Sequence, residues 1–341
     1  MTKSQLMASQ GMRVQGLGGA LGVCVAAGML AGCGGPHVGG PAIVPPSGAG
    51  ASRTVHGRSW MLPEARRETL LYIGDPGSGG VLVYTYLPAL RFVGVLATPS
   101  HPGGECVDKA QNVFVTDLAS GSHVTYEYAH AGASPIAILG DPGGTPSSCA
   151  IDPTTGDLAV TSVRSGTTHG KVAIYKGARG TPKLFADYNF YDVLFCGYDD
   201  KGNLYVDGSN KPSGNGFLMD ELPKGGKALS EITLNQAIFF PGGVEWDGKH
   251  VAVGDERVAT VYQFAINEYD GKKVGTTRLR GLPGIYQFLI YHSLIVDPSY
   301  VASNGSVAIY RYPAGGRAMK TITGVSSPYS AVVSLPTRTG H

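Results

Sequence analysis

The same short pattern of residues occurs six times along this chain. In each copy an apolar segment ends in a large side chain, and a turn rich in glycine and proline leads to the next apolar segment. The large residues are spaced 42, 47, 47, 42 and 48 positions apart, and they are Tyr86, Tyr128, Tyr175, Leu222, Phe264 and Tyr312. A repeat of about 45 residues that holds several short strands is typical of a β-propeller. The sequence therefore predicts an all-β fold, a six-bladed β-propeller.

One repeat, residues 193–234, can be divided into strands and turns from its composition alone. Asp199 to Gly202 form an expected hairpin turn, because Asp and Gly tolerate the backbone angles of tight turns. Segments dense in Val, Ile, Tyr and Phe between such turns indicate strands. The predicted strands of this repeat are 193–198, 203–206, 217–222 and 228–234.

The two ends of the repeat array complement each other. The first repeat begins at 70–73, which aligns with a second strand, so it lacks an inner strand of its own. The segment 329–335 resembles an inner strand with nothing after it. We therefore expect a propeller at 69–335 whose C-terminal strand closes the first blade, with a tail at 336–341. Closure removes two unpaired sheet edges.

The N-terminal segment has the pattern of a bacterial lipoprotein leader. Lys3 and Arg13 precede an apolar stretch that ends Leu30-Ala31-Gly32-Cys33. Small residues before a cysteine indicate cleavage and lipidation there, so we expect a signal peptide at 1–32 and a lipid on Cys33. The alternative is an uncleaved signal anchor or a transmembrane helix. A flexible tether is expected at 33–68, which begins rich in Gly and Pro, although Trp60 to Pro63 should already contact the domain.

This leader predicts a location and a first partner. The domain is expected outside the cytoplasm, anchored in a membrane of the bacterial cell envelope through its N-terminal lipid. Nucleic acid is not an expected partner, because only 15% of residues are charged, the net charge is +2 and no basic stripe is present.

Three cysteines remain after the leader, and all fall on predicted inner strands of successive repeats: Cys106, Cys149 and Cys196. We expect packed, unreactive thiols. A disulfide between neighbouring blades is an alternative, which we disfavour because inner strands usually lie farther apart than the roughly 7 Å between Cα atoms that a disulfide allows. A three-thiolate metal site is the third possibility, and no histidine or fourth ligand accompanies it.

Candidate ligand-binding residues lie where the chain enters the inner strands. They are Tyr191, Asp192, Tyr286, Gln287 and Tyr329. Aromatic rings near the channel could stack on a sugar or another ring. The alternative is that they close the mouth of the channel. Aspartates also recur near the ends of second strands and are expected to cap turns; these are Asp75, Asp117, Asp207, Asp255 and Asp297.

Two recurring motifs link the chain to known propellers, Pro241-Gly242-Gly243-Val244 and the turn-strand segment 201–206. Over 70–335 the chain resembles the six-bladed propellers that include NHL-repeat proteins and the gluconolactonase and streptogramin-lyase types. Across 104–109, 195–204 and 241–249 it is similar to a family of uncharacterised bacterial lipoprotein propellers. The resemblance implies a fold and provides no catalytic residues.

The enzymes of that group differ from this chain at their functional positions. Lactonase-type propellers hold a divalent cation with Glu, Asn and Asp, whereas the corresponding segments here read Pro-Gly-Gly or Pro-Ser-Ser, and Asp192 alone offers a carboxylate. One such ligand is too few for that metal. Lyase-type propellers use a His with a Glu, and the nearest match is His101 with Glu105. We therefore expect no metal or cofactor and a non-catalytic binding or scaffold module for a protein or glycan; a cryptic hydrolase or lyase is the alternative.

Overall fold

The computed structural model describes residues 53–55, 57–165, 169–214, 216–299 and 305–337, all within one compact unit that spans 48–341. The predicted signal peptide, Cys33 and the first part of the tether lie outside the described residues. The described part is all-β, with short 3-10 helices at η1 (Pro63–Arg67), η2 (Lys176–Ala178) and η3 (Glu256–Val258). Within it, no helix has the length and apolarity needed to cross a membrane.

Antiparallel sheets built from consecutive strands make up most of this unit. One sheet holds β5 (Pro102–Val107), β6 (Val113–Asp117), β7 (Val124–Tyr128) and β8 (Pro135–Gly140). The next holds β9 (Thr145–Ile151), β10 (Leu158–Val163), β11 (Lys171–Tyr175) and β12 (Lys183–Phe185). A third holds β13 (Asp192–Tyr198), β14 (Leu204–Ser209), β15 (Phe217–Leu222) and β16 (Ser230–Glu231).

A larger, nine-stranded sheet follows. Its strands are β17 (Thr233–Leu234), β18 (Pro241–Trp246), β19 (Val251–Asp255), β20 (Thr260–Asn267), β21 (Asp270–Arg280), β22 (Leu289–Tyr291), β23 (Leu294–Ser299), β24 (Ser306–Arg311) and β25 (Gly315–Ile322). Strands β21 and β25 join its two halves by parallel pairing at Leu279–Gly316 and Arg280–Arg317.

The remaining sheet brings the two ends of the domain together. It contains β1 (Trp60–Met61), β2 (Leu70–Asp75), β3 (Gly80–Thr85), β4 (Phe92–Leu96) and β26 (Ser330–Ser334). The C-terminal strand β26 pairs antiparallel with β2, from Leu70–Ser334 to Gly74–Ser330. Trp60 and Met61 pair with β4, so the contact expected for this end of the tether is confirmed.

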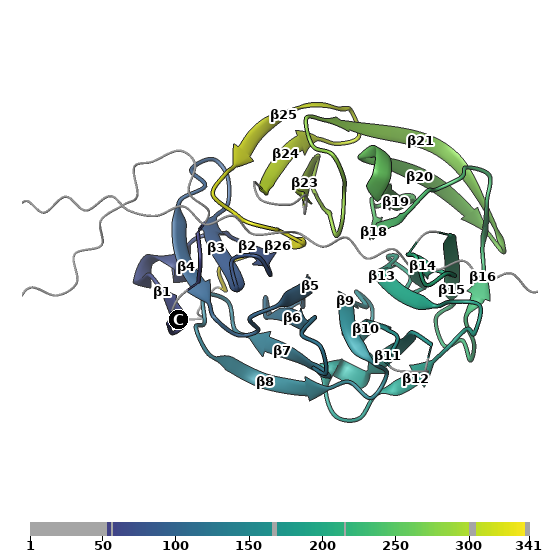
Figure 1. Ribbon diagram of the computed structural model, residues 1–341, viewed down its shortest axis with the longest axis horizontal. Helices are drawn as coiled ribbons and strands as arrows, with labels where there is room; N and C mark the ends of the chain where they lie inside the picture. The colour runs from purple at the N-terminus through teal and green to yellow at the C-terminus, as the bar shows by residue number, and fades with distance from the viewer. Residues whose placement is uncertain (1–52, 56, 166–168, 215, 300–304, 338–341) are drawn as a thin grey trace, which may run out of the picture. The chain divides into compact units, whose positions relative to one another are not determined.

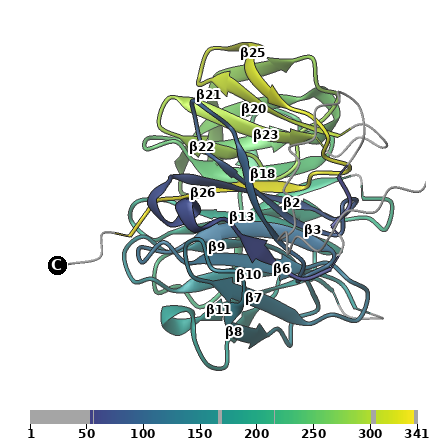
Figure 2. The same ribbon diagram turned by 90° about the vertical axis from the view of Figure 1, so that its left-hand side faces the viewer.

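The sheets are arranged around a central channel. The innermost strands β26, β5, β9, β13, β18 and β22 follow one another, each in contact with the next, and β22 returns to β26 (Figure 1). In the side view, the yellow β26 lies alongside the dark blue β2 (Figure 2). We call the end at which innermost strands begin the upper mouth of the channel, and the end at which they finish the lower mouth.

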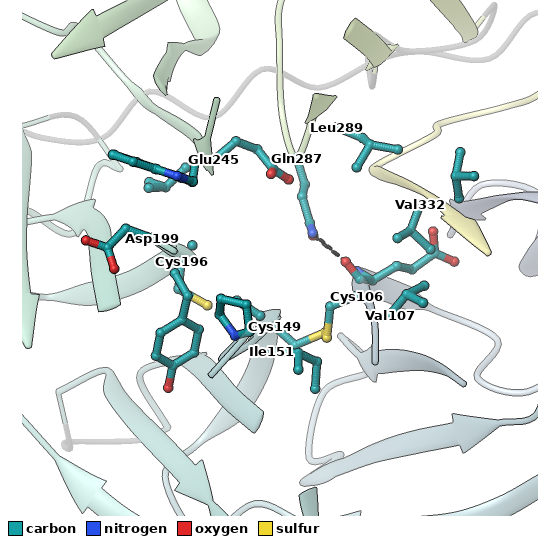
Figure 3. A pocket seen from close by; sticks show the side chains of 18 of the residues that line it. Cys106, Val107, Cys149, Ile151, Cys196, Asp199, Glu245, Gln287, Leu289 and Val332 are labelled. Atoms are coloured by element: carbon teal, nitrogen blue, oxygen red, sulfur yellow. Dashed lines mark hydrogen bonds between the residues drawn. A yellow bond between two sulfur atoms is a disulfide. The ribbon is translucent and has the colours of Figure 1, made fainter. Parts of the chain in front are cut away.

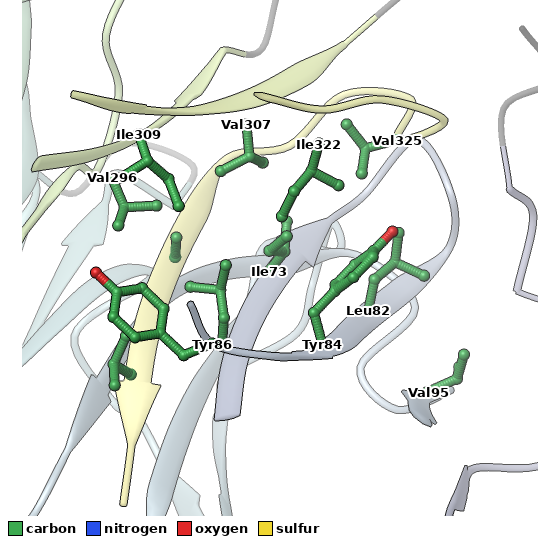
Figure 4. Packing of buried hydrophobic residues seen from close by; sticks show 13 residues of the cluster. Ile73, Leu82, Tyr84, Tyr86, Val95, Val296, Val307, Ile309, Ile322 and Val325 are labelled. Atoms are coloured by element: carbon green, nitrogen blue, oxygen red, sulfur yellow. The ribbon is translucent and has the colours of Figure 1, made fainter. Parts of the chain in front are cut away.

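Apolar side chains fill the spaces between neighbouring sheets. Between the sheet of β1–β4 and β26 and the nine-stranded sheet, Ile73 and Leu82 pack with Val307 and Ile309. None of the four is more than 1% exposed (Figure 4). Ala331 and Val333 of β26 belong to the same cluster. The closing strand is therefore held by both backbone pairing and apolar burial.

The outermost strand predicted at 228–234 is only partly correct. Strand β16 ends at Glu231, and Thr233 and Leu234 pair in parallel with Asp270 and Gly271 of β21. The chain thus leaves one sheet and joins the edge of the next within a few residues. This pairing is long-range, and local composition carries no signal for it.

The recurring aspartates fall into two structural classes. Asp75 and Asp255 cap turns as expected: Asp75 accepts hydrogen bonds from the backbone of Ser78 and Ser327, and Asp255 accepts one from Phe239. Asp117 accepts from Ala119 and Ser122. Asp207 and Asp297 instead lie two residues before the ends of β14 and β23, at 0% exposure, and neither carboxyl group makes a hydrogen bond of ordinary geometry. The turn-capping prediction is wrong for these two.

Candidate upper-mouth site and the central channel

Gln287 spans the channel rather than facing solvent. Its side-chain Nε2 donates to the Glu105 carbonyl at 2.7 Å, and its Oε1 accepts from the Glu105 amide at 3.1 Å and from Ser148 Oγ at 3.3 Å. One amide side chain thus connects the segment before β22 with β5 and β9. Its polar atoms are engaged by protein, so this predicted site residue holds neighbouring sheets together.

Tyr329 lies inside the channel beside Gln287 and is 8% exposed. Its ring stacks on Phe195 at 6.0 Å between centroids and contacts the ring of Tyr286 at 5.4 Å. Its hydroxyl is 3.3 Å from Ser147 Oγ. Side chains from four of the innermost segments therefore meet across the axis at this level.

The other predicted site residues surround the upper mouth and are half-buried. The Arg164 guanidinium lies 4.4 Å from the centre of the Tyr191 ring, and Asp192 Oδ1 accepts a hydrogen bond from the Arg164 amide. Tyr286 donates a hydrogen bond of 2.8 Å to Glu256 Oε1. Burial raises the pKa of Glu256, although this hydrogen bond lowers it in part. The structure thus places Tyr191, Asp192 and Tyr286 at one mouth and Gln287 and Tyr329 within the channel.

Further aromatic residues at this mouth were missed by the sequence analysis. Tyr188 is 77% exposed, and Phe239 is 54% exposed with the Arg257 guanidinium 5.7 Å from its ring centre. Tyr188 lies four residues before the start of β13 and Phe239 two residues before the start of β18, and these positions in the segments that enter innermost strands are the sequence signal that could have identified them. We call this set the aromatic–arginine surface: Arg164, Tyr188, Tyr191, Phe239, Arg257 and Tyr286.

The expectation of packed thiols is wrong for two of the three cysteines. Cys106 of β5 and Cys149 of β9 form a disulfide with 5.7 Å between their Cα atoms, and Cys196 is a buried free cysteine. The two strands approach closely because Gly103 and Gly104 precede Cys106. A Cβ atom on Gly104 would lie only 2.6 Å from the Cα atom of Ser148.

A hollow of about 420 Å³ lies at the lower mouth, opposite the predicted site. The disulfide and Cys196 lie on its wall, and the side chains of Glu245 and Gln287 extend toward its middle (Figure 3). Among the described residues, no group of three or more His, Cys, Asp and Glu side chains could hold a metal ion. The channel thus has an aromatic mouth and an acidic mouth, separated by Gln287 and Tyr329.

Comparison with known proteins gives the fold and no family. No protein-family model matches the sequence, and no curated protein matches it. A chain in the crystal structure of a nidogen/laminin complex matches over 79% of this chain and 98% of its own length, with 16% identity and a TM-score of 0.61. A protein of unknown function from Bacteroides caccae matches over 78% of this chain and 99% of its own length, with 12% identity and a TM-score of 0.58. At these identities the similarity shows a β-propeller fold.

Proposed function

We propose that this chain is a six-bladed β-propeller lipoprotein of the bacterial envelope that acts as a non-catalytic binding module for a protein ligand. The blade count rests on treating the nine-stranded sheet as two blades. Its halves, β18–β21 and β22–β25, pair with each other only at the parallel β21–β25 contact on the outer rim. Each half then has the four-stranded form of β5–β8.

The observation that carries the binding role is the aromatic–arginine surface. Interfaces between proteins are enriched in Tyr, Phe and Arg, and the residues that dominate binding energy are commonly of these types. Arg164 and Arg257 stack on aromatic rings here, which orders both partners of each pair before any ligand arrives. Preordered side chains lose less conformational entropy on binding.

The side chains that fill the channel below this surface favour binding of a ligand at the upper mouth. Gln287 and Tyr329 occupy the channel with their polar atoms in protein contacts, so a ligand would meet the half-buried and exposed side chains around the mouth. The nidogen/laminin match comes from a complex between proteins, which accords with this use of the fold. Anchoring through Cys33 would present the surface outside the cytoplasm.

Site-specific photocrosslinking in cells tests the proposal. A photoreactive phenylalanine analogue would replace Tyr188 or Phe239 in the full chain, and Ile138 on β8 is the control, because it is 59% exposed and lies on an outer strand. We expect adducts of defined mass from the first two positions and none from Ile138. Peptides of a second protein in the excised adduct, identified by mass spectrometry, indicate a protein partner, whereas an adduct that contains no second protein and loses its added mass on glycosidase treatment indicates a glycan. Identical adducts from all three positions, or none from any, would contradict the proposal.

A further inference from the structure

The hollow at the lower mouth has the size and shape of a small-molecule site. Its volume of about 420 Å³ falls within the range of roughly 300–1,000 Å³ that is usual for ligand pockets. Apolar side chains from several innermost strands form much of its wall, and they include Val107, Ile151, Leu289 and Val332 (Figure 3). It lies apart from the aromatic–arginine surface and is not used by the function proposed above.

The charged side chains on this wall all have the same sign. Among the described residues that line the hollow, the charged ones are Glu105, Asp199, Asp200 and Glu245, with no Lys, Arg or His. Asp199 is already used, since its Oδ1 accepts from the amides of Lys201 and Asn203. Asp200 is exposed on the turn. Glu245, on β18, is the acid whose side chain extends into the hollow (Figure 3).

No basic group of the described residues compensates the charge of Glu245. Burial raises its pKa to about 8, and no neighbouring cation opposes this effect. The titratable groups around it are acids: Glu105, Cys196, Tyr198, Asp199, Asp200 and Tyr312. The adjoining turn carries two basic residues, the exposed Lys249 and His250, which lies 3.7 Å from Asp247, and neither lines the hollow. An ionised carboxylate that is partly removed from water is stabilised by a cation beside it.

Trp246 follows Glu245 on β18 and also lines the hollow. Its indole nitrogen is enclosed by protein, so the N–H does not face the open space of the hollow. Adjacent residues of a strand point to opposite faces, so Glu245 is the polar group of this pair that a ligand would meet. Trp246 is close enough to report on a ligand that binds there.

We propose that the hollow at the lower mouth binds an organic cation, a primary ammonium or guanidinium group on a short apolar chain, with Glu245 as its counter-ion. The apolar chain would lie against Val107, Ile151 and Val332, and the cationic group would reach the Glu245 carboxyl. This ligand supplies the positive charge that the wall lacks. A neutral ligand of the same length would gain the apolar contacts alone.

Fluorescence of Trp246 provides the assay. The chain has two tryptophans, and Trp60 lies on β1, where it is 38% exposed and packs on Phe92. A Trp60→Phe variant of the full chain therefore leaves Trp246 as its single tryptophan reporter. The probes are n-butylammonium and n-butylguanidinium, with pentan-1-ol as the neutral control and pentanoate as the anionic control.

We expect saturable changes with the two cations and at least tenfold weaker responses to pentan-1-ol and pentanoate. Adding Glu245→Gln should weaken cation binding at least tenfold, or about 1.4 kcal/mol, while leaving the pentan-1-ol response unchanged. Gln has the shape of the protonated acid, so this variant should fold. Glu268→Gln, on the exposed turn between β20 and β21 and away from the hollow, is the matched control and should change cation binding less than twofold.

Three outcomes would overturn the proposal. The first is no saturable response to either cation up to about 100 mM, a concentration that corresponds to ~1.4 kcal/mol. The second is equal binding of pentan-1-ol and the cations, which would mean an apolar site. The third is unchanged cation binding in the Glu245→Gln variant, which would place the response elsewhere. None of these bears on the photocrosslinking result at the upper mouth.

Discussion

Replacing Asp207 by threonine should stabilise the protein, and the gain should grow with pH. The equivalent strand positions in two other sheets hold Thr116 and Thr161. Thr116 Oγ1 donates toward the carbonyls of Gly104 and Ser147, on two neighbouring innermost strands. Thr161 does the same toward Ser148 and Leu194. Asp207→Thr would place a hydroxyl donor where the present side chain is a buried acid.

The magnitude follows from the linkage between protonation and folding. Burial raises the pKa of Asp207 well above its ordinary value, and the backbone of Phe195, which is near but outside ordinary hydrogen-bond geometry, offsets this only in part. The folded state therefore keeps the proton at a pH where the unfolded chain, with a pKa of about 3.9, has lost it. The free energy of unfolding is highest below pH ~4, where Asp207 is protonated in both states. It falls by about 1.4 kcal/mol per pH unit as the pH rises from there toward the folded-state pKa.

Denaturant unfolding at pH 4, 5 and 6 measures this effect. The Asp207→Thr variant should lose this dependence, so its advantage over the natural protein should increase from pH 4 to pH 6, by at most about 1.4 kcal/mol per pH unit. Asp200→Asn, on an exposed turn, controls for removing an acid and should not change the dependence. Parallel pH profiles for Asp207→Thr and the natural protein would refute the reasoning, because they would mean that Asp207 is ionised in the folded state.

Three further predictions concern the channel, the cysteines and the anchor. Gln287→Ala should lower the free energy of unfolding by about 3 kcal/mol, since it leaves the Glu105 amide and carbonyl buried without partners; a loss below ~1 kcal/mol in denaturant unfolding would contradict the bridging role. A soluble chain beginning at residue 53 should titrate one thiol when denatured without reductant and three after reduction; three thiols before reduction would argue against the disulfide. Cys33→Ser should release the protein from the membrane fraction or leave an uncleaved precursor, whereas an unmodified Cys33 in the mature natural protein, by mass spectrometry, would rule out lipidation.

Much of the fold was predictable because its signals are local. Turn residues bound the segment 217–222, and β15 occupies those residues. The closing strand was expected at 329–335 from the incomplete first repeat, and β26 at Ser330–Ser334 pairs with β2. In both cases alternation of turns and apolar segments is sufficient, since neighbouring strands of these sheets are mostly neighbours in sequence.

The parts that could not be predicted depend on contacts between sheets. The disulfide requires β5 and β9 to approach at Gly104, and nothing near Cys106 in sequence specifies its distance from Cys149. Asp207 and Asp255 look alike in sequence, yet a shift of one strand position turns one toward the buried interface and the other toward a turn. Successive side chains of a strand point to opposite faces, so a shift of one residue decides which face a side chain occupies.

In the candidate site too, the positions of residues could be predicted from the sequence, whereas their contacts could not. The positions of Tyr191, Asp192, Tyr286, Gln287 and Tyr329 in the repeat placed them near the channel, and the structure locates all five at its upper mouth or inside it. That Gln287 bonds to Glu105 and Ser148 depends on side-chain geometry across the axis. Tyr188 and Phe239 were missed because one exposed aromatic in a connecting segment carries little weight in a chain with 18 tyrosines and 10 phenylalanines.

Deleting residues 326–341 is the most direct test of the central claim, that the C-terminal strand closes a propeller ring. The deletion removes β26 and its pairs with Leu70 to Gly74, together with the apolar contacts of Ala331 and Val333. It exposes an edge of β2, which favours aggregation. We expect the truncated chain to lose its cooperative unfolding transition and to aggregate, while the full chain stays monomeric under the same conditions. A monomeric truncated chain with an unchanged melting temperature would contradict closure by this strand.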